Sequence, residues 1–229
     1  MDNWNFLRTS KAGSEIFAES RAAAQEATRP LMITIVSGIP RSGTSLMMQM
    51  MRAGGMPVLT DGLRAADANN PRGYFELEPL KALARDQQAI AQADGKVVKV
   101  ISSLLPNLPR QFDYRIIFMC RPLSEVVASQ NRMLDRLGKE VPQSPTAAVI
   151  AAFDAHLRKI KLWLTRQPNM AVLYVEYLRV LQAPEEQAAN VCAFLERQLD
   201  VAAMAGQVEQ SLHREKSAPP SAPVRDFAL

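Results

Sequence analysis

The chain contains little cysteine and no long apolar run. Its two cysteines, Cys120 and Cys192, lie far apart, one in a strand-like run and one in a helix-like run. The sequence therefore offers no disulfide framework, and a reducing compartment fits it best. The longest uninterrupted apolar run, 147–153, is far too short to span a bilayer, and charged residues interrupt the first part of the chain. We expect a cytoplasmic protein without a transmembrane segment.

Neither sign of charge dominates the composition. The chain has 27 Lys and Arg against 23 Asp and Glu, a net charge of +4, which favours an anionic ligand without requiring a polyanion. The densest basic stretch, 156–163, is typical of the solvated face of an amphipathic helix whose apolar residues, such as Ile160, turn inward. We therefore expect no nucleic-acid partner. At 229 residues, the chain can bury a sizeable core without disulfides or metals.

A β-branched apolar run, 31–36, leads into a glycine-containing turn and then into a helix-like run. The run predicts a buried strand, and Gly38 and Gly43 supply the backbone freedom of a tight turn. Their spacing nearly matches the triphosphate-binding loop G-x-x-x-x-G-K-[ST], but Thr44 replaces the lysine, and the only cation is Arg41. These features predict an anion-binding loop at a helix N-terminus. An ordinary strand-turn-helix connection is the alternative.

Strand-like and helix-like segments alternate along the rest of the chain. Strands are expected at 96–101, 114–120 and 170–175, and helices at 79–92, 122–137, 147–166 and 177–212, the last broken at Ala183-Pro184. This order predicts one α/β domain, 1–229, with a mostly parallel central sheet flanked by helices in three layers, where ligands bind at the carboxyl ends of the strands. Residues 1–29 are expected to form a helical extension and residues 217–229 a flexible tail.

A second anion site is predicted where the strand at 114–120 ends. Arg121 follows this strand directly, and Ser129 lies eight residues later, about two turns into the next helix and roughly on the face of its first residue. Together they can hold a second phosphate. The alternative is a surface ion pair for Arg121 and a helix-packing role for Ser129.

Three motifs in order resemble the sulfotransferases that use 3′-phosphoadenosine 5′-phosphosulfate (PAPS). Pro40-Arg41-Ser42-Gly43-Thr44-Ser45 resembles their 5′-phosphosulfate loop, P-[KR]-S-G-T-[ST]; Cys120-Arg121-Pro122 through Ser129 resembles their 3′-phosphate motif; and Val175-Glu176-Tyr177-Leu178, with Ala183-Pro184, is similar to their Y-E-D-L…D-P signature. Asn70-Pro71-Arg72-Gly73-Tyr74-Phe75-Glu76 resembles the N-P-x-G-[YF]-x-E segment of bacterial-type members, and Leu212-His213-Arg214 resembles their closing helix.

This resemblance implies a P-loop sulfotransferase fold and in-line transfer of a sulfuryl group from PAPS to a hydroxyl or amine acceptor, without a required metal. It implies that Arg41 supports the bridging oxygen as negative charge builds, that the loop holds the 5′-phosphate, and that Arg121 and Ser129 hold the 3′-phosphate. The implied donor-binding residues are Gly38, Pro40, Arg41, Ser42, Gly43, Thr44, Ser45, Arg121, Ser129 and Arg214.

The general base departs from the commonest family pattern. Many members carry a histidine in a K-T-H-like segment after a strand, whereas this chain has Lys99-Val100-Ile101-Ser102. The resemblance implies that Lys99 lies beside the transferring group. Other members use a carboxylate, so Glu76 is predicted to deprotonate the acceptor, with Glu78 in reserve. A first-turn glutamate at a helix N-terminus is the alternative for Glu76. His156 and His213, lone histidines in helical contexts, are weaker candidates.

Two other functions fit the same loop. An ATP- or GTP-dependent kinase or NTPase is favoured by Glu176, which ends a strand, but disfavoured by the missing loop lysine and by Arg121. A non-catalytic nucleotide-binding module would keep the loop and lack the chemistry. For a sulfotransferase, a small hydroxylated metabolite, a lipid head group or a sugar would serve as acceptor, because variable loops such as 61–78 and 138–145 form acceptor pockets. The oligomeric state is left open.

Overall fold

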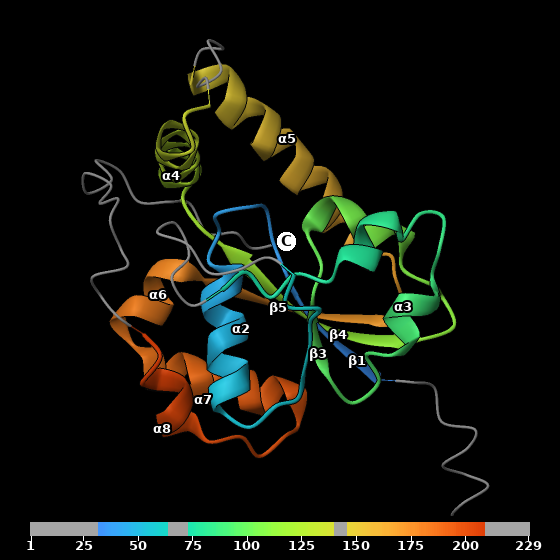
Figure 1. The fold of residues 1–229 in the computed structure, drawn as a ribbon. Coiled ribbons are helices and arrows are strands. Elements are labelled where there is room, and N and C mark those ends of the chain that lie inside the picture. The colour runs from blue at the N-terminus through green and yellow to red at the C-terminus, as the bar shows by residue number, and fades with distance from the viewer. Residues whose placement is uncertain (1–31, 64–72, 140–145, 209–229) are drawn as a thin grey trace, which may run out of the picture. The chain divides into compact units, whose positions relative to one another are not determined.

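The computed structural model describes residues 32–63, 73–139 and 146–208. The chain divides at residue 31 into two units, and all described residues belong to the second, Met32–Leu229. The described strands form one parallel sheet of order β2-β3-β1-β4-β5 (Figure 1). They are β1 (Met32–Ser37), β2 (Val58–Leu59), β3 (Val97–Lys99), β4 (Asp113–Cys120) and β5 (Met170–Glu176). The expected parallel α/β sheet is therefore confirmed.

Helices cover both faces of this sheet (Figure 1). The α-helices are α2 (Thr44–Ala53), α3 (Gln88–Ala91), α4 (Leu123–Arg136), α5 (Thr146–Leu164), α6 (Tyr177–Gln182), α7 (Pro184–Leu195) and α8 (Val201–Ala205), and the 3₁₀-helices are η1 (Glu78–Ala82) and η2 (Ser102–Asn107). None of the helices in the described ranges is long and apolar enough to cross a membrane.

Two buried clusters lie on opposite faces of the sheet. On β1, side chains alternate between the faces, so Val36 packs with α2, α6, α7 and α8, whereas Ile33 and Ile35 pack with η1, α3, η2 and the last turns of α5. All three side chains are fully buried. This division produces the three layers that the sequence predicts, and it leaves the carboxyl ends of β1, β3 and β4 between the layers.

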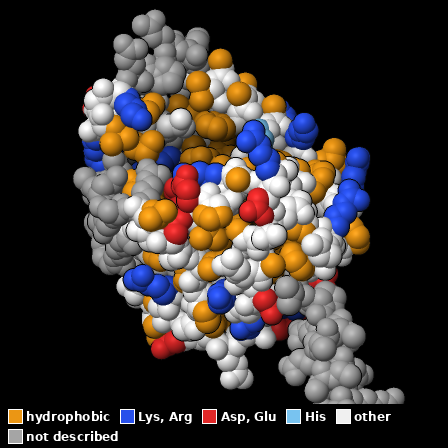
Figure 2. Space-filling model, turned by 45° about the vertical axis from the view of Figure 1, so that its right-hand side comes forward, with side chains coloured by type: hydrophobic (Ala, Val, Ile, Leu, Met, Phe, Trp, Pro, Cys, Tyr) orange, Lys and Arg blue, Asp and Glu red, His pale blue; other side chains and the backbone are white. Residues whose placement is uncertain are grey.

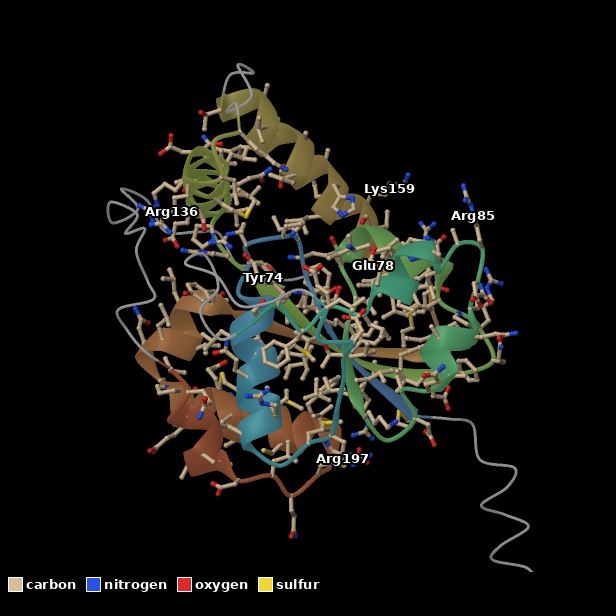
Figure 3. All side chains as sticks on the ribbon, viewed as in Figure 1. Tyr74, Glu78, Arg85, Arg136, Lys159 and Arg197 are labelled. Atoms are coloured by element: carbon tan, nitrogen blue, oxygen red, sulfur yellow. The ribbon has the colours of Figure 1, made fainter. Side chains whose placement is uncertain are left out.

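The basic stretch in α5 has the predicted orientation. Ile160 and Leu164 are buried, while Lys159 is exposed and its side chain points away from the rest of the described chain (Figure 3). Arg158 is exposed as well, whereas Lys161 is half-buried, with its ammonium 5.1 Å from the centre of the Tyr174 ring.

The single helix expected over 79–92 is wrong. The segment contains η1 and the short α3, separated by residues 83–87. The side chain of Asp86 accepts a hydrogen bond from the Gln88 amide at 2.9 Å, and such a local bond competes with the helical hydrogen-bond ladder. Leu80, Leu83 and Ile90 are all buried, so the segment follows the surface of the sheet instead of one helix axis.

The helical region after Tyr177 has two breaks in the described part of the chain. The break at Ala183-Pro184 is confirmed, because it separates α6 from α7. A second, unpredicted break follows α7, where Glu196 adopts a left-handed conformation with φ 52°. Asp200 then caps α8 by accepting from the Ala203 amide at 2.9 Å. The expected extension at 1–29, the tail at 217–229 and Arg214 lie outside the described residues.

Candidate active site

The loop from Gly38 to Gly43 connects the central strand β1 to α2 at the carboxyl end of the sheet. Three of its residues have positive φ: 148° at Gly38, 72° at Arg41 and 101° at Gly43. A left-handed conformation is uncommon for a residue with a side chain and is most often maintained at functional sites. Loops with such residues form concave backbone sites for anions.

The two glycines are required by close contacts. A Cβ atom at Gly43 would lie 2.5 Å from Cδ2 of Tyr177, and one at Gly38 would lie 2.4 Å from Ser42 Oγ and 2.9 Å from the Met119 carbonyl oxygen. The loop is therefore packed tightly against β4 and α6. No described side chain caps α2 at Gly43, and the first amides of a helix have no partner within the helix. This terminus is therefore a suitable place for an anion.

The loop hydroxyls differ in exposure. Ser42 is fully buried, and its Oγ has no hydrogen-bond partner among the described residues. Thr44 is buried and Ser45 partly buried, whereas Pro40 is exposed. Buried hydroxyls are usually hydrogen-bonded, so Ser42 is a polar group in the loop that an additional acceptor or donor would satisfy.

Arg41 and Arg121 bring the two predicted anion sites into direct contact. Arg41 Nε donates to Ser129 Oγ at 2.9 Å, and Arg121 Nη1 donates to the Arg41 carbonyl oxygen at 3.2 Å. Arg121 begins the connection from β4 to α4, and β4 pairs directly with β1. Ser129, in the second turn of α4, is 5% exposed. Arg41 of the loop thus contacts Ser129 of the second predicted site, and Arg121 of the second site contacts the backbone of Arg41.

Arg121 is held in a buried environment. Its Nε donates to Glu125 Oε2 at 2.9 Å, and the two side chains are only 6% and 3% exposed. Its guanidinium lies 4.4 Å from the centre of the Tyr177 ring, a cation–π distance. Burial raises the pKa of Tyr177, although Arg121 and Arg41 act in the opposite direction. Arg121 therefore forms an ion pair, as the alternative interpretation predicts, but this pair is buried and not at the surface.

Lys99 and Glu76 lie together on the other side of β1. Lys99 ends β3, and its Nζ donates to the Tyr74 carbonyl oxygen and lies 3.8 Å from Glu76 Oε1. Glu76 Oε2 is 3.9 Å from Lys81 Nζ. Glu78 pairs with the same lysine at 2.6 Å, but its side chain is 57% exposed. The structure thus brings the predicted Lys99 and Glu76 together, and Tyr74 and Glu78 lie on the same short segment (Figure 3).

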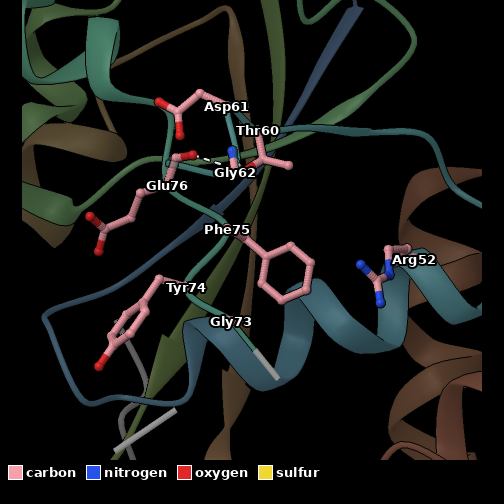
Figure 4. Close-up of a pocket in the computed structure, with 8 residues that line it drawn as sticks. All are labelled: Arg52, Thr60, Asp61, Gly62, Gly73, Tyr74, Phe75 and Glu76. Atoms are coloured by element: carbon pink, nitrogen blue, oxygen red, sulfur yellow. Dashed lines mark hydrogen bonds between the residues drawn. The ribbon is translucent and has the colours of Figure 1, made fainter. Parts of the chain in front are cut away.

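Hydrogen bonds from the turn after β2 hold the segment 73–78 in place. Thr60 donates its hydroxyl to the Glu76 carbonyl oxygen at 2.8 Å, and Asp61 accepts from the amides of Glu78 and Leu63. These backbone bonds hold the pKa of Asp61 below its ordinary value. Phe75, buried, has φ 52°. A pocket of about 140 Å³ is lined by Thr60, Asp61, Phe75 and Glu76 together with Arg52, Gly62, Gly73 and Tyr74 (Figure 4).

One further polar pair lies beside the loop. His156 Nε2 of α5 is 2.9 Å from Ser102 Oγ, which is 2% exposed, and the Ser102 amide donates to the Gly38 carbonyl oxygen at 3.0 Å. In the sequence, His156 is a lone histidine in a helical context and a weaker candidate for the general base, and no motif predicts its contact with Ser102. Its position four residues before the inward-facing Ile160 is the signal that places both on one helix face.

The model of the sulfotransferase domain family matches residues 33–222. The chain belongs to the sulfotransferase domain family. It resembles the sulfotransferase domain of the olefin synthase from Synechococcus PCC 7002, with 17% identity, a TM-score of 0.50 and coverage of 83% of this chain and 82% of that one. It also resembles sulfotransferase STF9 from Mycobacterium avium, with 12% identity, a TM-score of 0.50 and coverage of 88% and 73%. No curated protein matches the chain.

Family membership confirms the resemblance inferred from the motifs, and the two solved sulfotransferase structures share the fold. For a sulfotransferase domain, two arrangements in this site are unexpected from the motifs alone. Glu125 pairs with Arg121, and the i,i+4 spacing of the two residues was the available signal. Ile101, two residues after the end of β3, is 37% exposed and stands where many family members have a histidine.

Proposed function

We propose that this protein transfers a sulfuryl group from PAPS to a hydroxyl or amine of an acceptor. The observation that carries the proposal is the contact between the two cationic sets, Arg41 Nε with Ser129 Oγ and Arg121 Nη1 with the Arg41 carbonyl. PAPS has two separate anionic ends, a 5′-phosphosulfate and a 3′-phosphate. Two adjoining sets of cations and hydroxyls match this distribution of charge better than they match a single triphosphate chain.

The residues present fit the 5′ end of such a donor. The close contacts at Gly38 and Gly43 leave no room for a Cβ atom at either position, and the uncapped start of α2 offers amides and a positive helix dipole. The proposed 5′ set is Gly38, Pro40, Arg41, Ser42, Gly43, Thr44 and Ser45, and the 3′ set is Arg121 and Ser129. Arg214 belongs to the proposal on the family motif alone.

The proposed chemistry is in-line transfer with charge stabilisation. PAPS supplies the activated sulfuryl group. Arg41 supports the bridging oxygen as the S–O bond to the 5′-phosphate breaks, and Lys99 stabilises charge on the transferring group. Glu76 fixes the ammonium of Lys99 through their ion pair. That Glu76 also takes the proton of the acceptor stays a prediction from the sequence, as do a single domain over 1–229 and a reaction that needs no metal.

The acceptor is proposed to be a small molecule, a lipid or a carbohydrate. The pocket beside Glu76, about 140 Å³, is smaller than typical ligand cavities, so it suits one functional group and not a whole large acceptor. Figure 2 shows that one face of the molecule has a hollow lined by hydrophobic side chains, with charged side chains around it. An acceptor with an apolar part and one hydroxyl or amine fits such a surface.

Calorimetric titration tests the donor assignment. The full chain is titrated with adenosine 3′,5′-bisphosphate (PAP), ATP and GTP, each with and without magnesium. We expect tight, magnesium-independent binding of PAP and weak binding of the triphosphates. Preference for Mg-ATP or Mg-GTP would contradict the proposal and support a kinase or NTPase.

A transfer assay tests catalysis separately. Radiolabelled PAPS is incubated with a panel of hydroxyl and amine acceptors, and labelled product is separated. Product formation is expected with at least one acceptor class. If the protein binds PAP but neither transfers the sulfuryl group to any acceptor nor slowly hydrolyses PAPS, the result would support a non-catalytic binding module.

A further inference from the structure

Arg52 lies in the last turn of α2 and lines the pocket beside the segment 73–78. Its guanidinium carbon is 5.3 Å from the centre of the Phe75 ring, a cation–π distance. Arg52 is exposed, whereas the ring beneath it is buried. Figure 4 shows Arg52 and the Phe75 ring on one side of the segment and the side chains of Tyr74 and Glu76 on the other. The ring therefore holds a solvent-accessible cation at one end of the pocket.

The two carboxylates that line the pocket already have partners. Asp61 accepts two backbone amides, one with each oxygen. Glu76 lies between two ammonium groups, with Lys99 Nζ 3.8 Å from Oε1 and Lys81 Nζ 3.9 Å from Oε2. Within the described residues, the Arg52 guanidinium has the ring contact but no ion pair. Arginine carries five N–H donors and no acceptor, so the pocket retains the binding capacity of a cationic donor.

The backbone of the segment is strained where it faces Arg52. Phe75 has φ 52°, in the left-handed region that side chains disfavour, and Gly73 has φ 92°. Such conformations persist where the surroundings impose them, and they are concentrated at sites that hold ligands. The Thr60 hydroxyl supports this conformation from the other strand by donating to the Glu76 carbonyl oxygen. The position of the ring under the guanidinium is therefore fixed by the backbone.

The helix α2 connects this cation to the proposed donor loop. Arg52 follows Ser45 by seven positions, so the two residues lie on one face of α2, two turns and about 10 Å apart. The opposite end of the pocket is formed by Glu76, which pairs with Lys99, the residue proposed to stabilise the transferring group. An acceptor whose reacting group lies beside Lys99 can therefore extend through the pocket toward Arg52.

We infer that the acceptor is a hydroxy or amino carboxylate and that Arg52 binds its carboxylate. This inference rests on the proposed sulfotransfer and narrows its substrate class. The guanidinium binds the two carboxylate oxygens through parallel N–H donors, and the hydroxyl or amine, about 10 Å away, lies beside Lys99. A carboxylate also suits the small volume of the pocket, about 140 Å³.

A matched control separates carboxylate binding from a helix-terminal effect. A cation in the last turn of a helix also interacts favourably with the helix dipole, and Arg52 is in that position on α2. Arg179 occupies the last turn of α6, is exposed and does not line the pocket. Arg179→Gln therefore reproduces the loss of a helix-terminal arginine without changing the pocket, and its urea midpoint should match that of Arg52→Gln.

Calorimetry with ω-hydroxyoctanoate and its methyl ester tests the inference, because the two compounds share the hydroxyl and differ in charge. The full-length protein, saturated with PAP, is titrated with each. Wild type and Arg179→Gln should bind the acid about tenfold or more tightly than the ester, as charge-assisted hydrogen bonds predict. Arg52→Gln should lose this preference. Arg52→Lys should keep part of it, since lysine retains the charge but not the fork of donors.

Three results would overturn the inference: no binding of the acid to wild type, equal affinities of wild type for acid and ester, or a preference retained in Arg52→Gln. The titrations are repeated without PAP, so that they test the pocket independently of the donor. If the preference for the acid is present but PAP does not bind or no transfer occurs, the proposed function fails and the carboxylate site stands. If PAP binding and transfer occur without the preference, only this inference fails.

Transfer from radiolabelled PAPS tests the separation of the two groups. The chain of ω-hydroxybutyrate is too short to span about 10 Å, so it cannot place its carboxylate at Arg52 and its hydroxyl beside Lys99 together. Wild-type kcat/KM should be about tenfold or more higher for ω-hydroxyoctanoate than for ω-hydroxybutyrate, and Arg52→Gln should reduce this ratio. Equal kcat/KM values for the two acids in wild type would refute the assigned separation.

Discussion

Arg41 Nε donates a hydrogen bond to Ser129 Oγ at 2.9 Å, across 88 positions of the sequence. The loop cation therefore contacts the hydroxyl that the motifs assign to the 3′-phosphate. Since Arg121 also bonds to the Arg41 carbonyl oxygen, a change at one proposed anion site should affect the geometry of the other.

Arg121→Ala should weaken binding of PAP by about 10- to 100-fold, because a hydrogen bond to a charged group contributes about 1.5–3 kcal/mol. Binding of adenosine 5′-monophosphate, which lacks the 3′-phosphate, should change much less. Arg121→Lys is the control that keeps the charge but loses the planar guanidinium over Tyr177. Calorimetry measures the affinities of wild type and both variants for PAP and for adenosine 5′-monophosphate. Equal losses of affinity for the two nucleotides in Arg121→Ala would refute the assignment of Arg121 to the 3′-phosphate.

Gly43→Ala should destabilise the fold and abolish PAP binding. Its Cβ atom would lie 2.5 Å from the Tyr177 ring at φ 101°. Gly55→Ala is a matched control, since Gly55 has φ 91° but nothing within 4 Å of its added Cβ. Both variants carry the cost of a left-handed alanine, about 1–2 kcal/mol, and Gly43→Ala should lose about 1–3 kcal/mol more through overpacking. Urea unfolding checks this difference, and equal stabilities would show that the loop tolerates the methyl group.

Glu76→Gln should lower turnover by about tenfold or more and leave PAP binding intact, because an amide cannot balance the ammonium groups of Lys99 and Lys81. Glu78→Gln is the control. Its side chain is 57% exposed and its ion pair with Lys81 is at the surface, where such pairs contribute little, so its turnover should stay close to wild type. Steady-state kinetics and calorimetry measure both, and an unchanged turnover in Glu76→Gln would remove Glu76 from the mechanism.

Asp61→Ala should loosen the segment 73–78, because it removes the acceptor of the Glu78 and Leu63 amides. We expect acceptor KM to rise by about threefold or more while PAP affinity stays constant, since each bond contributes about 1 kcal/mol. An acceptor KM equal to that of wild type would show that Asp61 does not act on the acceptor site.

The same aspartate gives a pH dependence of stability. Backbone hydrogen bonds lower the pKa of folded Asp61 below its ordinary value of 3.8. Its stabilising contribution is therefore complete above that value and is lost as the pH falls through the lowered pKa. The unfolding free energies of wild type and Asp61→Asn should differ at pH 7, and this difference should be smaller at pH 3, which lies below the ordinary pKa. Urea unfolding at both pH values measures this, and a constant difference would contradict it.

Local patterns in the sequence predicted β1, its loop and α2 well. The alternation of 31–36, the two glycines and the apolar run after Thr44 all act within about one strand and one helix, so no distant contact was needed to interpret them. The two-residue strand β2 was missed, because nothing but its pairing with β3 makes it a strand. The prediction of one helix over 79–92 was wrong for a similar reason, because burial of Leu83 and Ile90 against the sheet determines the path of this segment.

The site was predicted as a set of residues but not as a set of contacts. The motifs identified Arg41, Arg121 and Ser129, yet only the strand order β3-β1-β4 brings them together. Sequence alone does not fix which strands flank β1. The same limit hid the pair of His156 with Ser102, because the packing of α5 on η2 joins segments that have no common motif.

The central place of β1 has a consequence for how the protein folds. Its neighbours in the sheet, β3 and β4, start about 60 and 80 residues after it, and parallel pairing at such separation forms slowly because long loops must close first. The proposed donor site takes residues from the loop between β1 and α2, from the start of α2, from the residue after β4 and from α4, so it would be complete only after these late pairings. A fragment that stops before β4 would lack the site, and PAP binding should therefore report the completion of folding.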